Sequence, residues 1–362
     1  MYKRELEALK NKGLFRERKI SEPHHTDLAS NDYLGLSKNW DIFEKSVSEM
    51  RNFGERSPKA SMLVNGYSQI HKDFEEKIAK MNRFQKGIVF GSGFLANFGV
   101  LEALQRKGDE LFLDSEYHAS GILITKCTKD FQIFTHNSAE DLENRLKNSS
   151  AKRKIVAVEG IYSMSGDILN RDIFDIADKY GAILLIDEAH SFGTVGKNLL
   201  GVFDYYEIEP KENHIKLGTL GKAVGSYGAY VLASENVISF LENRAKTVIY
   251  STAPSLFETL ISKNSIQFIY DNRKEFYSEI RERKDFFNQK LSIKRESLIF
   301  PIPMRSPEKA VETRNELLEE GFVVGAIRPP TVPKPILRVI PNLKISVVEL
   351  EKFERILKEY IV

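Results

Sequence analysis

The chain is almost free of cysteine. Cys127 is the single cysteine among 362 residues, so no internal disulfide can form and the usual cysteine spacings of metal sites are absent. An excess of either charge is also missing, because 53 Lys and Arg face 51 Asp and Glu, for a net charge of +2. This balance gives no electrostatic basis for binding nucleic acid or a membrane surface. We therefore expect a protein of a reducing compartment with neither partner and with no metal.

Long apolar runs are absent as well. No run approaches the roughly 20 residues that a membrane-spanning helix needs, and the first residues, MYKRELEALKNKG, are charged and amphipathic, unlike a secretory signal. The content of 42% hydrophobic and 29% charged residues is ordinary for a globular protein. We expect a cytoplasmic protein that is long enough to form more than one lobe.

A complete dinucleotide fingerprint is the third missing feature. The segment KGIVFGSGFLANFGVLEAL predicts a short strand, a Gly-Ser-Gly turn and a helix. This arrangement aims backbone N–H groups and a helix N-terminus at one point, which suits a phosphate, although such a turn can also be only a turn. After Gly91 and Gly93, Ala96 stands where the third glycine is required. The motif therefore disfavours a nicotinamide enzyme.

A repeated strand and helix pattern occupies the middle of the chain. The segments DELFLDSEYHASGI, KIVAVEGIYSMSGDI and GAILLIDEAHSFGTVG each join an apolar strand to a polar cluster at its C-terminal end, and DIFDIADKY has helical spacing. This alternation predicts an α/β fold with a mostly parallel sheet covered on both faces. Ligands of such sheets bind beyond the carboxyl ends of the strands. The polar residues expected there are His118, Glu159, Ser163, Asp187, His190 and Lys222.

The pattern changes after Ser251 and Thr252, where charged helical stretches over 256–292 are followed by a shorter α/β pattern and a C-terminal helix, VVELEKFERILKEY. Helices are also expected over 2–12, ending at Gly13, and over 70–81. We expect a lobe boundary near Pro254. The predicted division is an N-terminal segment over 1–40, a large ligand-binding domain over 41–254 and a small C-terminal domain over 255–362.

Lys222 lies among small residues in GTLGKAVGS. A free lysine has a pKa of about 10.4, so its neutral amine lies roughly 4–5 kcal/mol uphill at pH 7, and a Schiff base with an aldehyde removes that handicap. The plainer alternative is a solvated loop charge. Asp187 could pair with a protonated ring nitrogen or could cap a helix. His190 could donate to a ring substituent, and His118 could stack on the ring or serve the core. Together with a phosphate-binding turn, these groups match the needs of pyridoxal 5′-phosphate.

An ordered set of motifs carries a family resemblance. The motifs are NDYLGLS, NGYSQIHKDFEEKIA, GSGFLAN, DSEYHAS, VEGIYSMSGDI, IDEAHSFGTVG, GTLGKAVGSYGAY and YSTAPS. In this order they resemble the α-oxoamine synthases, a family of pyridoxal phosphate enzymes, over about 28–260 and again over 321–343. The resemblance implies a fold-type-I transferase with a mostly parallel sheet in the large domain and a smaller C-terminal α/β domain.

The resemblance also implies roles for individual residues. Lys222 would hold the cofactor aldehyde and act as general base, Asp187 would pair with the ring nitrogen, His190 would donate to the phenolic oxygen, and His118 would stack on the ring. The implied phosphate contacts are Gly93, Phe94 and Thr219, with Thr252 reaching the phosphate of the other subunit of a homodimer. Glu159 and Ser163 match polar positions beside the cofactor. The implied substrate contacts are Asn31, Arg338, Thr331 and Arg16.

The loop VVGAIRPPTVP resembles that of the family member that acts in biotin biosynthesis. This implies a decarboxylative condensation of L-alanine with a pimeloyl thioester, carried by coenzyme A or by an acyl carrier protein. One alternative is a sister synthase such as glycine C-acetyltransferase, and another is a non-catalytic scaffold, which should lack Lys222. Segments near the N-terminus and before Arg338 are shorter than in the family, so the roles of Arg16 and Arg338 depend on where the gaps are placed.

Overall fold

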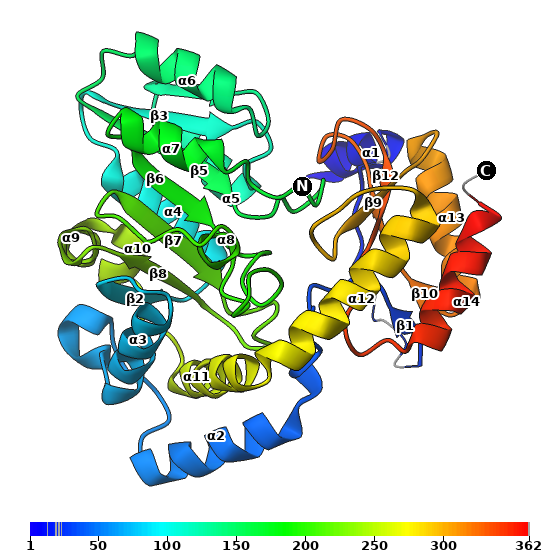
Figure 1. Cartoon of the computed structure of the whole chain (residues 1–362), viewed down its shortest axis with the longest axis horizontal. Helices are drawn as coiled ribbons and strands as arrows, with labels where there is room; N and C mark the ends of the chain where they lie inside the picture. Colours follow the sequence, from blue (N-terminus) through cyan, green and yellow to red (C-terminus); the bar gives the residue numbers. More distant parts are fainter. Residues whose placement is uncertain (13, 19, 21, 23, 361–362) are drawn as a thin grey trace.

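The computed structural model describes residues 1–12, 14–18, 20, 22 and 24–360. It contains a large lobe built on a central sheet and a smaller lobe beside it, with the long helix α12 (Arg273–Leu291) running between them (Figure 1). The predicted end of the first helix at Gly13 lies outside the described residues.

The large lobe is organised around a seven-stranded sheet with the strand order β2-β8-β7-β6-β5-β3-β4. Strand β8 runs antiparallel to both of its neighbours, and the other pairs are parallel, which confirms the mostly parallel sheet. The strands are β2 (Lys86–Phe90), β3 (Asp109–Asp114), β4 (Phe131–Phe134), β5 (Arg153–Glu159), β6 (Ile183–Asp187), β7 (His214–Thr219) and β8 (Ala229–Ala233).

Helices cover both faces of this sheet. Leu184 and Ile186 of β6 belong to one hydrophobic core, and Leu185 between them belongs to another, because successive side chains of a strand point to opposite faces. The helices of the large lobe are α2 (Trp40–Phe53), α3 (Gln69–Met81), α4 (Gly93–Leu104), α5 (Ala119–Ile122), α6 (Ala139–Asn148), α7 (Asp172–Lys179), α8 (Val202–Tyr205), α9 (Glu235–Arg244), α10 (Lys246–Ile249) and α11 (Leu256–Asp271). The helices predicted over 70–81 and from DIFDIADKY are confirmed.

The small lobe has its own hydrophobic core. Its three-stranded antiparallel sheet has the order β11-β12-β9, and β10 (Phe322–Val323) pairs in parallel with β1 (Thr26–Asp27) from the start of the chain. The remaining elements are β9 (Phe300–Pro303), β11 (Gly325–Ile327), β12 (Ile336–Val339), α13 (Pro307–Glu319) and α14 (Val347–Lys358). The predicted C-terminal helix and the α/β pattern before it are confirmed.

The position of the lobe boundary follows from the packing of α11. This helix packs against α2 and α3, and its Ile266 and Ile269 belong to a core of the large lobe. We therefore propose that the boundary lies near Asn272, between α11 and α12, rather than near Pro254. The pairing of β1 with β10 likewise favours counting residues 26–27 with the small lobe.

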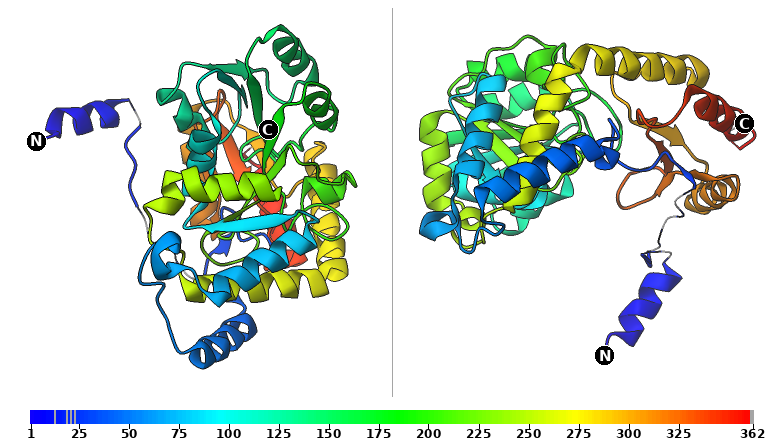
Figure 2. Two further views of the ribbon diagram at one scale, coloured as in Figure 1. Left: turned by 90° about the vertical axis from the view of Figure 1, so that its left-hand side faces the viewer. Right: turned by 90° about the horizontal axis from the view of Figure 1, so that it is seen from below.

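The N-terminal helix α1 (Lys3–Asn11) agrees with the prediction over 2–12 and buries none of its residues. It stands away from both lobes (Figure 2), and its apolar side chains Leu6 and Leu9 are exposed. Within the part of the chain that the structure describes, no helix combines the length and apolar character needed to cross a membrane.

Candidate active site

A cavity of about 190 Å³ opens at the carboxyl ends of β5, β6 and β7. Its wall also includes the N-terminus of α4 and the residue that caps α5. Eight of the ten predicted cofactor residues line it, namely Gly93, Phe94, His118, Glu159, Asp187, His190, Thr219 and Lys222. These residues come from segments far apart in the sequence, so the sheet edge brings them together as expected for this type of sheet.

Lys222 lies in a tight turn after β7. The turn is closed by bonds from the backbone N–H of Gly225 to the Lys222 carbonyl and from that of Ser226 to the Leu220 carbonyl, both 2.9 Å. Gly225 has a positive φ of 68°, and a Cβ there would come within 2.8 Å of the backbone of Leu36. The small residues around Lys222 therefore let the NDYLGLS segment pack against this turn.

The electrostatics of Lys222 suit a reactive amine. Burial lowers its pKa to about 8, although Asp187 and Glu159 oppose the shift. A pKa near 8 places the neutral amine only about 1.4 kcal/mol uphill at pH 7. The alternative of a solvated loop charge is therefore wrong, and Lys222 is suited to act as a nucleophile and a base.

Asp187 ends β6 and is buried. Its Oδ2 accepts a hydrogen bond of 2.7 Å from Asn97 Nδ2, and its Oδ1 accepts one of 3.0 Å from the Ala189 N–H. Burial raises the pKa of Asp187, while Lys222 and His118 oppose this rise. No helix begins directly after β6, since the next one is α8 at Val202, so the helix-cap alternative for Asp187 is wrong.

Two supporting residues, Asn97 and Tyr117, were missed by the sequence reasoning. Asn97 lies on α4 and is buried, and its Oδ1 accepts a 2.7 Å hydrogen bond from the hydroxyl of Tyr117. This contact orients the amide so that its Nδ2 faces Asp187. An available signal was the position of Asn97 at the end of the GSGFLAN motif, where a polar residue interrupts an apolar helix face.

His190 is buried between two polar partners. Its Nε2 lies 2.6 Å from Lys222 Nζ, and its Nδ1 lies 2.6 Å from the hydroxyl of Tyr33. Burial lowers the pKa of His190 well below its usual value, and the charges of Lys222 and Arg338 lower it further. The imidazole is therefore neutral at physiological pH. Tyr33 was also missed, although it belongs to the quoted NDYLGLS motif.

His118 lies at the start of α5 and lines the cavity. Its Nδ1 contacts the Ser120 hydroxyl at 2.7 Å. Burial lowers the pKa of His118, and Lys222 contributes in the same direction while Asp187 opposes it. A neutral imidazole in this position presents a flat surface to a ring in the cavity.

Arg338 and Asn31 meet although 307 positions separate them in the chain. The NH2 group of Arg338 donates to Asn31 Oδ1 at 3.1 Å, and its Nε donates to the carbonyl of Ser163 at 2.7 Å. Arg338 is buried and belongs to β12 of the small lobe, whereas Ser163 belongs to the large lobe. The predicted carboxylate-binding pair is thus assembled where the two lobes meet.

Glu159 carries an unpaired polar atom in the wall of the cavity. Its Oε2 accepts a 3.0 Å hydrogen bond from the Ser163 N–H, but Oε1 is buried without a partner among the described residues. Burial and the neighbouring Asp187 raise the pKa of Glu159 well above its usual value. A buried polar group is normally hydrogen-bonded, so this oxygen indicates a ligand.

The donor set fits pyridoxal 5′-phosphate. The Ser92 hydroxyl caps α4 by accepting from the Leu95 N–H at 3.2 Å, and a Cβ on Gly93 would lie 3.4 Å from Thr219 Oγ1. A helix N-terminus and a hydroxyl thus meet where a phosphate can bind. Asp187 supplies a carboxylate for the ring nitrogen, and Lys222 supplies an amine for the aldehyde.

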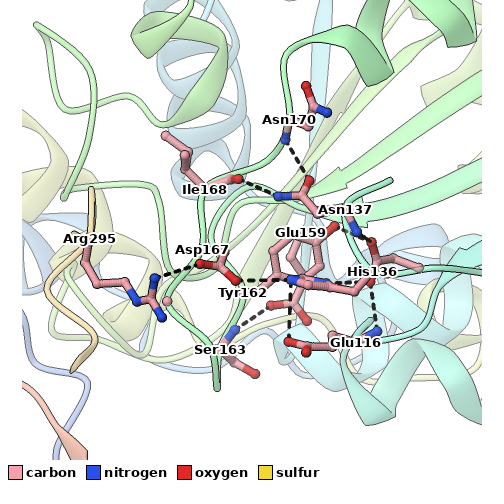
Figure 3. A network of polar contacts seen from close by, with 12 residues as sticks. Glu116, His136, Asn137, Glu159, Tyr162, Ser163, Asp167, Ile168, Asn170 and Arg295 are labelled. Atoms are coloured by element: carbon pink, nitrogen blue, oxygen red, sulfur yellow. Dashed lines mark hydrogen bonds and ion pairs between the residues drawn. The ribbon is translucent and has the colours of Figure 1, made fainter. Parts of the chain in front are cut away.

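A polar network supports the turn over 159–163 from behind (Figure 3). His136 contacts Asp114 at 3.1 Å and Asp167 at 3.3 Å, and the Tyr162 hydroxyl donates to Asp114 at 2.8 Å. Burial disfavours the charged form of His136, but the hydrogen bonds to Asp114 and Asp167 outweigh this and raise its pKa to about 10. Arg295 of the small lobe pairs with Asp167 at 3.2 Å, so the network also joins the lobes.

Three predicted residues do not line the cavity. Thr252 is exposed in the loop before α11, Thr331 is exposed in the loop before β12, and Arg16 is exposed in the N-terminal segment. Arg16 instead lines a second hollow of about 430 Å³ formed with Leu6, Leu9, Leu14, Phe15 and Pro330. The roles of these three residues stay predictions.

The sequence over residues 23–358 matches the aminotransferase class I and II family. The chain belongs to this family and, within it, to the α-oxoamine synthases, which are pyridoxal 5′-phosphate-dependent acyltransferases of fold type I.

Individual relatives narrow the comparison. The chain is 41% identical to the 8-amino-7-oxononanoate synthase of Helicobacter pylori strain J99, with 99% of this chain and 97% of the relative aligned. It is 36% identical to the enzyme of that name from Saccharophagus degradans, over 86% and 80% of the two chains.

Solved structures resemble the fold. Serine palmitoyltransferase of Sphingomonas wittichii gives a TM-score of 0.89 at 26% identity, over 99% of this chain and 95% of that one. The 8-amino-7-oxononanoate synthase of Francisella tularensis gives 0.77 at 26% identity, over 93% and 98%.

Proposed function

We propose that this chain catalyses the decarboxylative condensation of L-alanine with a pimeloyl thioester to give 8-amino-7-oxononanoate, a step of biotin biosynthesis. The observation that carries the proposal is the single cavity in which Lys222, Asp187, His190 and His118 converge. Full-length similarity to relatives with this activity in their name supports the choice of substrates.

The residues divide the work of the reaction. Pyridoxal 5′-phosphate, when bound, supplies an electron sink for a carbanion at the α-carbon of the amino acid. Asp187, held by Asn97 and the Ala189 N–H, keeps a carboxylate facing the ring nitrogen. Lys222 accepts the α-proton at Nζ, for which a pKa of about 8 is well matched to neutral pH. Its amine therefore serves first as a nucleophile and then as a base.

Arg338 and Asn31 are proposed to bind the carboxylate of alanine. A guanidinium can hold two carboxylate oxygens at once, and that of Arg338 is fixed by its bonds to Asn31 and to the Ser163 carbonyl. The carboxylate must later leave as carbon dioxide, so a contact that comes partly from the small lobe allows the lobes to regulate its surroundings.

We further propose a homodimer in which Thr252 reaches the cofactor phosphate of the other subunit. Thr252 is exposed and follows Tyr250, which is 80% exposed. The Ala253 N–H bonds to the Ala60 carbonyl at 2.9 Å, which brings this loop beside the exposed Leu63 and Val64. A contiguous apolar patch of this kind indicates a protein contact. The roles of Thr331 and Arg16 in substrate binding, a carrier-protein partner and a cytoplasmic location stay predictions.

A side-by-side assay tests the proposal. The purified enzyme, loaded with pyridoxal 5′-phosphate, is given L-alanine with pimeloyl-CoA or a pimeloyl carrier protein, and in parallel glycine with acetyl-CoA. We expect carbon dioxide and a product of the mass of 8-amino-7-oxononanoate from one or both pimeloyl donors. Turnover of glycine and acetyl-CoA without turnover of alanine would instead assign a sister synthase.

The control is Lys222→Ala, which we expect to abolish turnover and the cofactor adduct that borohydride fixes. A wild-type protein that does not take up pyridoxal 5′-phosphate would contradict catalysis altogether and favour a scaffold.

A further inference from the structure

Tyr33 and His190 are in direct contact deep in the protein. The Tyr33 hydroxyl lies 2.6 Å from His190 Nδ1, although 157 positions separate the two residues. Their side chains are almost fully buried, and the rings meet at an interplanar angle of 73°. The other ring nitrogen of His190 contacts Lys222 Nζ at 2.6 Å. Each nitrogen of this buried imidazole thus has one polar side-chain partner.

The protons in this chain of contacts can be arranged in two consistent ways. When Lys222 is an ammonium, it can only donate, so Nε2 accepts, Nδ1 carries the ring proton and donates to the Tyr33 oxygen, and the Tyr33 hydroxyl turns toward Asn31 Oδ1 at 3.4 Å. When Lys222 is neutral, Nε2 carries the ring proton and donates to Nζ, and Tyr33 donates to Nδ1. The two arrangements differ by the one proton that Lys222 releases to solvent.

A hydroxyl suits both arrangements because it can donate and accept. Burial raises the pKa of Tyr33 to about 12, so its proton is retained at neutral pH. The groups that face His190 are Lys222, Arg338, His118 and Tyr33 itself. No carboxylate pairs with the ring in the described part of the chain, so the imidazole changes tautomer rather than charge.

We propose that Tyr33 is a positioning residue that sets the tautomer of His190, and that this tautomer follows the charge on Lys222. The proposal deepens the proposed function and rests on it for one consequence. The tautomer with the proton on Nε2 can donate to the phenolic oxygen of the cofactor, and it is the form that the Tyr33 O–H stabilises from the opposite nitrogen.

The tautomer can be measured directly in the full-length protein without cofactor, by ¹⁵N spectra of labelled histidine, because protonated and unprotonated ring nitrogens have distinct shifts. We expect the proton of His190 to reside on Nδ1 at pH 6 and on Nε2 at pH 9–10, with the change near pH 8, where Lys222 titrates. A single tautomer across this whole range would overturn the coupling to Lys222.

Variants separate positioning from packing. In Tyr33→Phe the Nδ1 atom has no partner in either arrangement, so we expect both tautomers at pH 6 and at pH 9, with intermediate shifts. The matched control is Tyr117→Phe, which removes another buried hydroxyl from the same site but one that bonds to Asn97, and it should keep the wild-type shifts. Wild-type shifts in Tyr33→Phe would assign Tyr33 a packing role and overturn the proposal.

Two further measurements keep the test independent of folding and of substrate. Lys222→Arg keeps a donor at all pH values, so it should hold the proton on Nδ1 up to pH 10 even if Tyr33→Phe does not fold. A ring that still changes tautomer in this variant would overturn the coupling. In the holoenzyme, Tyr33→Phe should displace the pH midpoint of the cofactor absorbance, whereas Tyr117→Phe should leave the His190 tautomer unchanged. None of these readouts requires turnover of alanine, so their failure is distinct from failure of the proposed function.

Discussion

The pair Lys216 and Glu188 allows a quantitative test of how the floor of the active site is held. Both side chains are completely buried, and Lys216 Nζ lies 3.4 Å from Glu188 Oε1. Glu188 also accepts hydrogen bonds from the Val202 N–H, at 2.9 and 3.0 Å, and from the Ser191 hydroxyl. Glu188 directly follows Asp187, so this pair fixes the segment from which His190 projects. Replacing Lys216 by Met keeps an apolar stem of similar length and removes only the ammonium.

The expected loss of stability is large. Breaking a buried ion pair by removing one partner costs about 3–5 kcal/mol, because the remaining charge stays buried without compensation. The unfolding entropy is about 2.1 cal/mol/K per residue near 60 °C, or about 0.76 kcal/mol/K for 362 residues. Lys216→Met should therefore lower Tm by about 4–7 °C in a calorimetric scan. Acid should reduce the loss, because protonation of Glu188 removes the unpaired charge.

A double variant and a surface control make this prediction decisive. Lys216→Met with Glu188→Gln removes both charges and should recover to within about 1–2 kcal/mol of the wild type, since neutral replacement of a buried pair is often tolerated. Lys59→Met breaks the exposed pair with Glu55 and should cost no more than about 1 kcal/mol. The reasoning is refuted if Lys216→Met melts within 1 °C of the wild type by this roughly estimated scale, or if the double variant is as unstable as the single one.

Three other outcomes follow from the contacts described. The pKa of His136 is about 10 in the folded protein and about 6.5 when unfolded, so its contribution of up to about 5 kcal/mol is fully present below pH 6.5 and is lost as the pH rises through 10; denaturation of His136→Gln should show a deficit at pH 6 that vanishes above pH 10. Asn97→Ala removes the 2.7 Å bond to Asp187 and should weaken cofactor binding by roughly 10–100-fold in a fluorescence titration, and unchanged affinity would contradict the orienting role. Ser92→Ala removes the cap of α4 and should cost about 1 kcal/mol in urea unfolding, whereas no loss would indicate that the cap is dispensable.

Much of the fold could be predicted because its determinants are local. The apolar strands β3, β5 and β6 each end in a polar cluster, and the helical spacing of 70–81 survives as α3. The lobe boundary was harder to predict because the charged pattern of 256–292 gives no sign that α11 packs on α2 and α3. Packing partners of an amphipathic helix are decided by shape across the whole lobe, which a periodic pattern does not encode.

The motifs in the sequence determined the identity of the cofactor residues by themselves: Lys222, Asp187, His190 and His118 follow from residue type and position at strand ends. Only the tertiary structure decided their electrostatic state and their supports. The contacts of Asn97 with Asp187, of Tyr33 with His190 and of Arg338 with Asn31 span 90, 157 and 307 positions. Hydrogen bonds and desolvation depend on distance in space, so they arise only once the chain has folded and water has left the site.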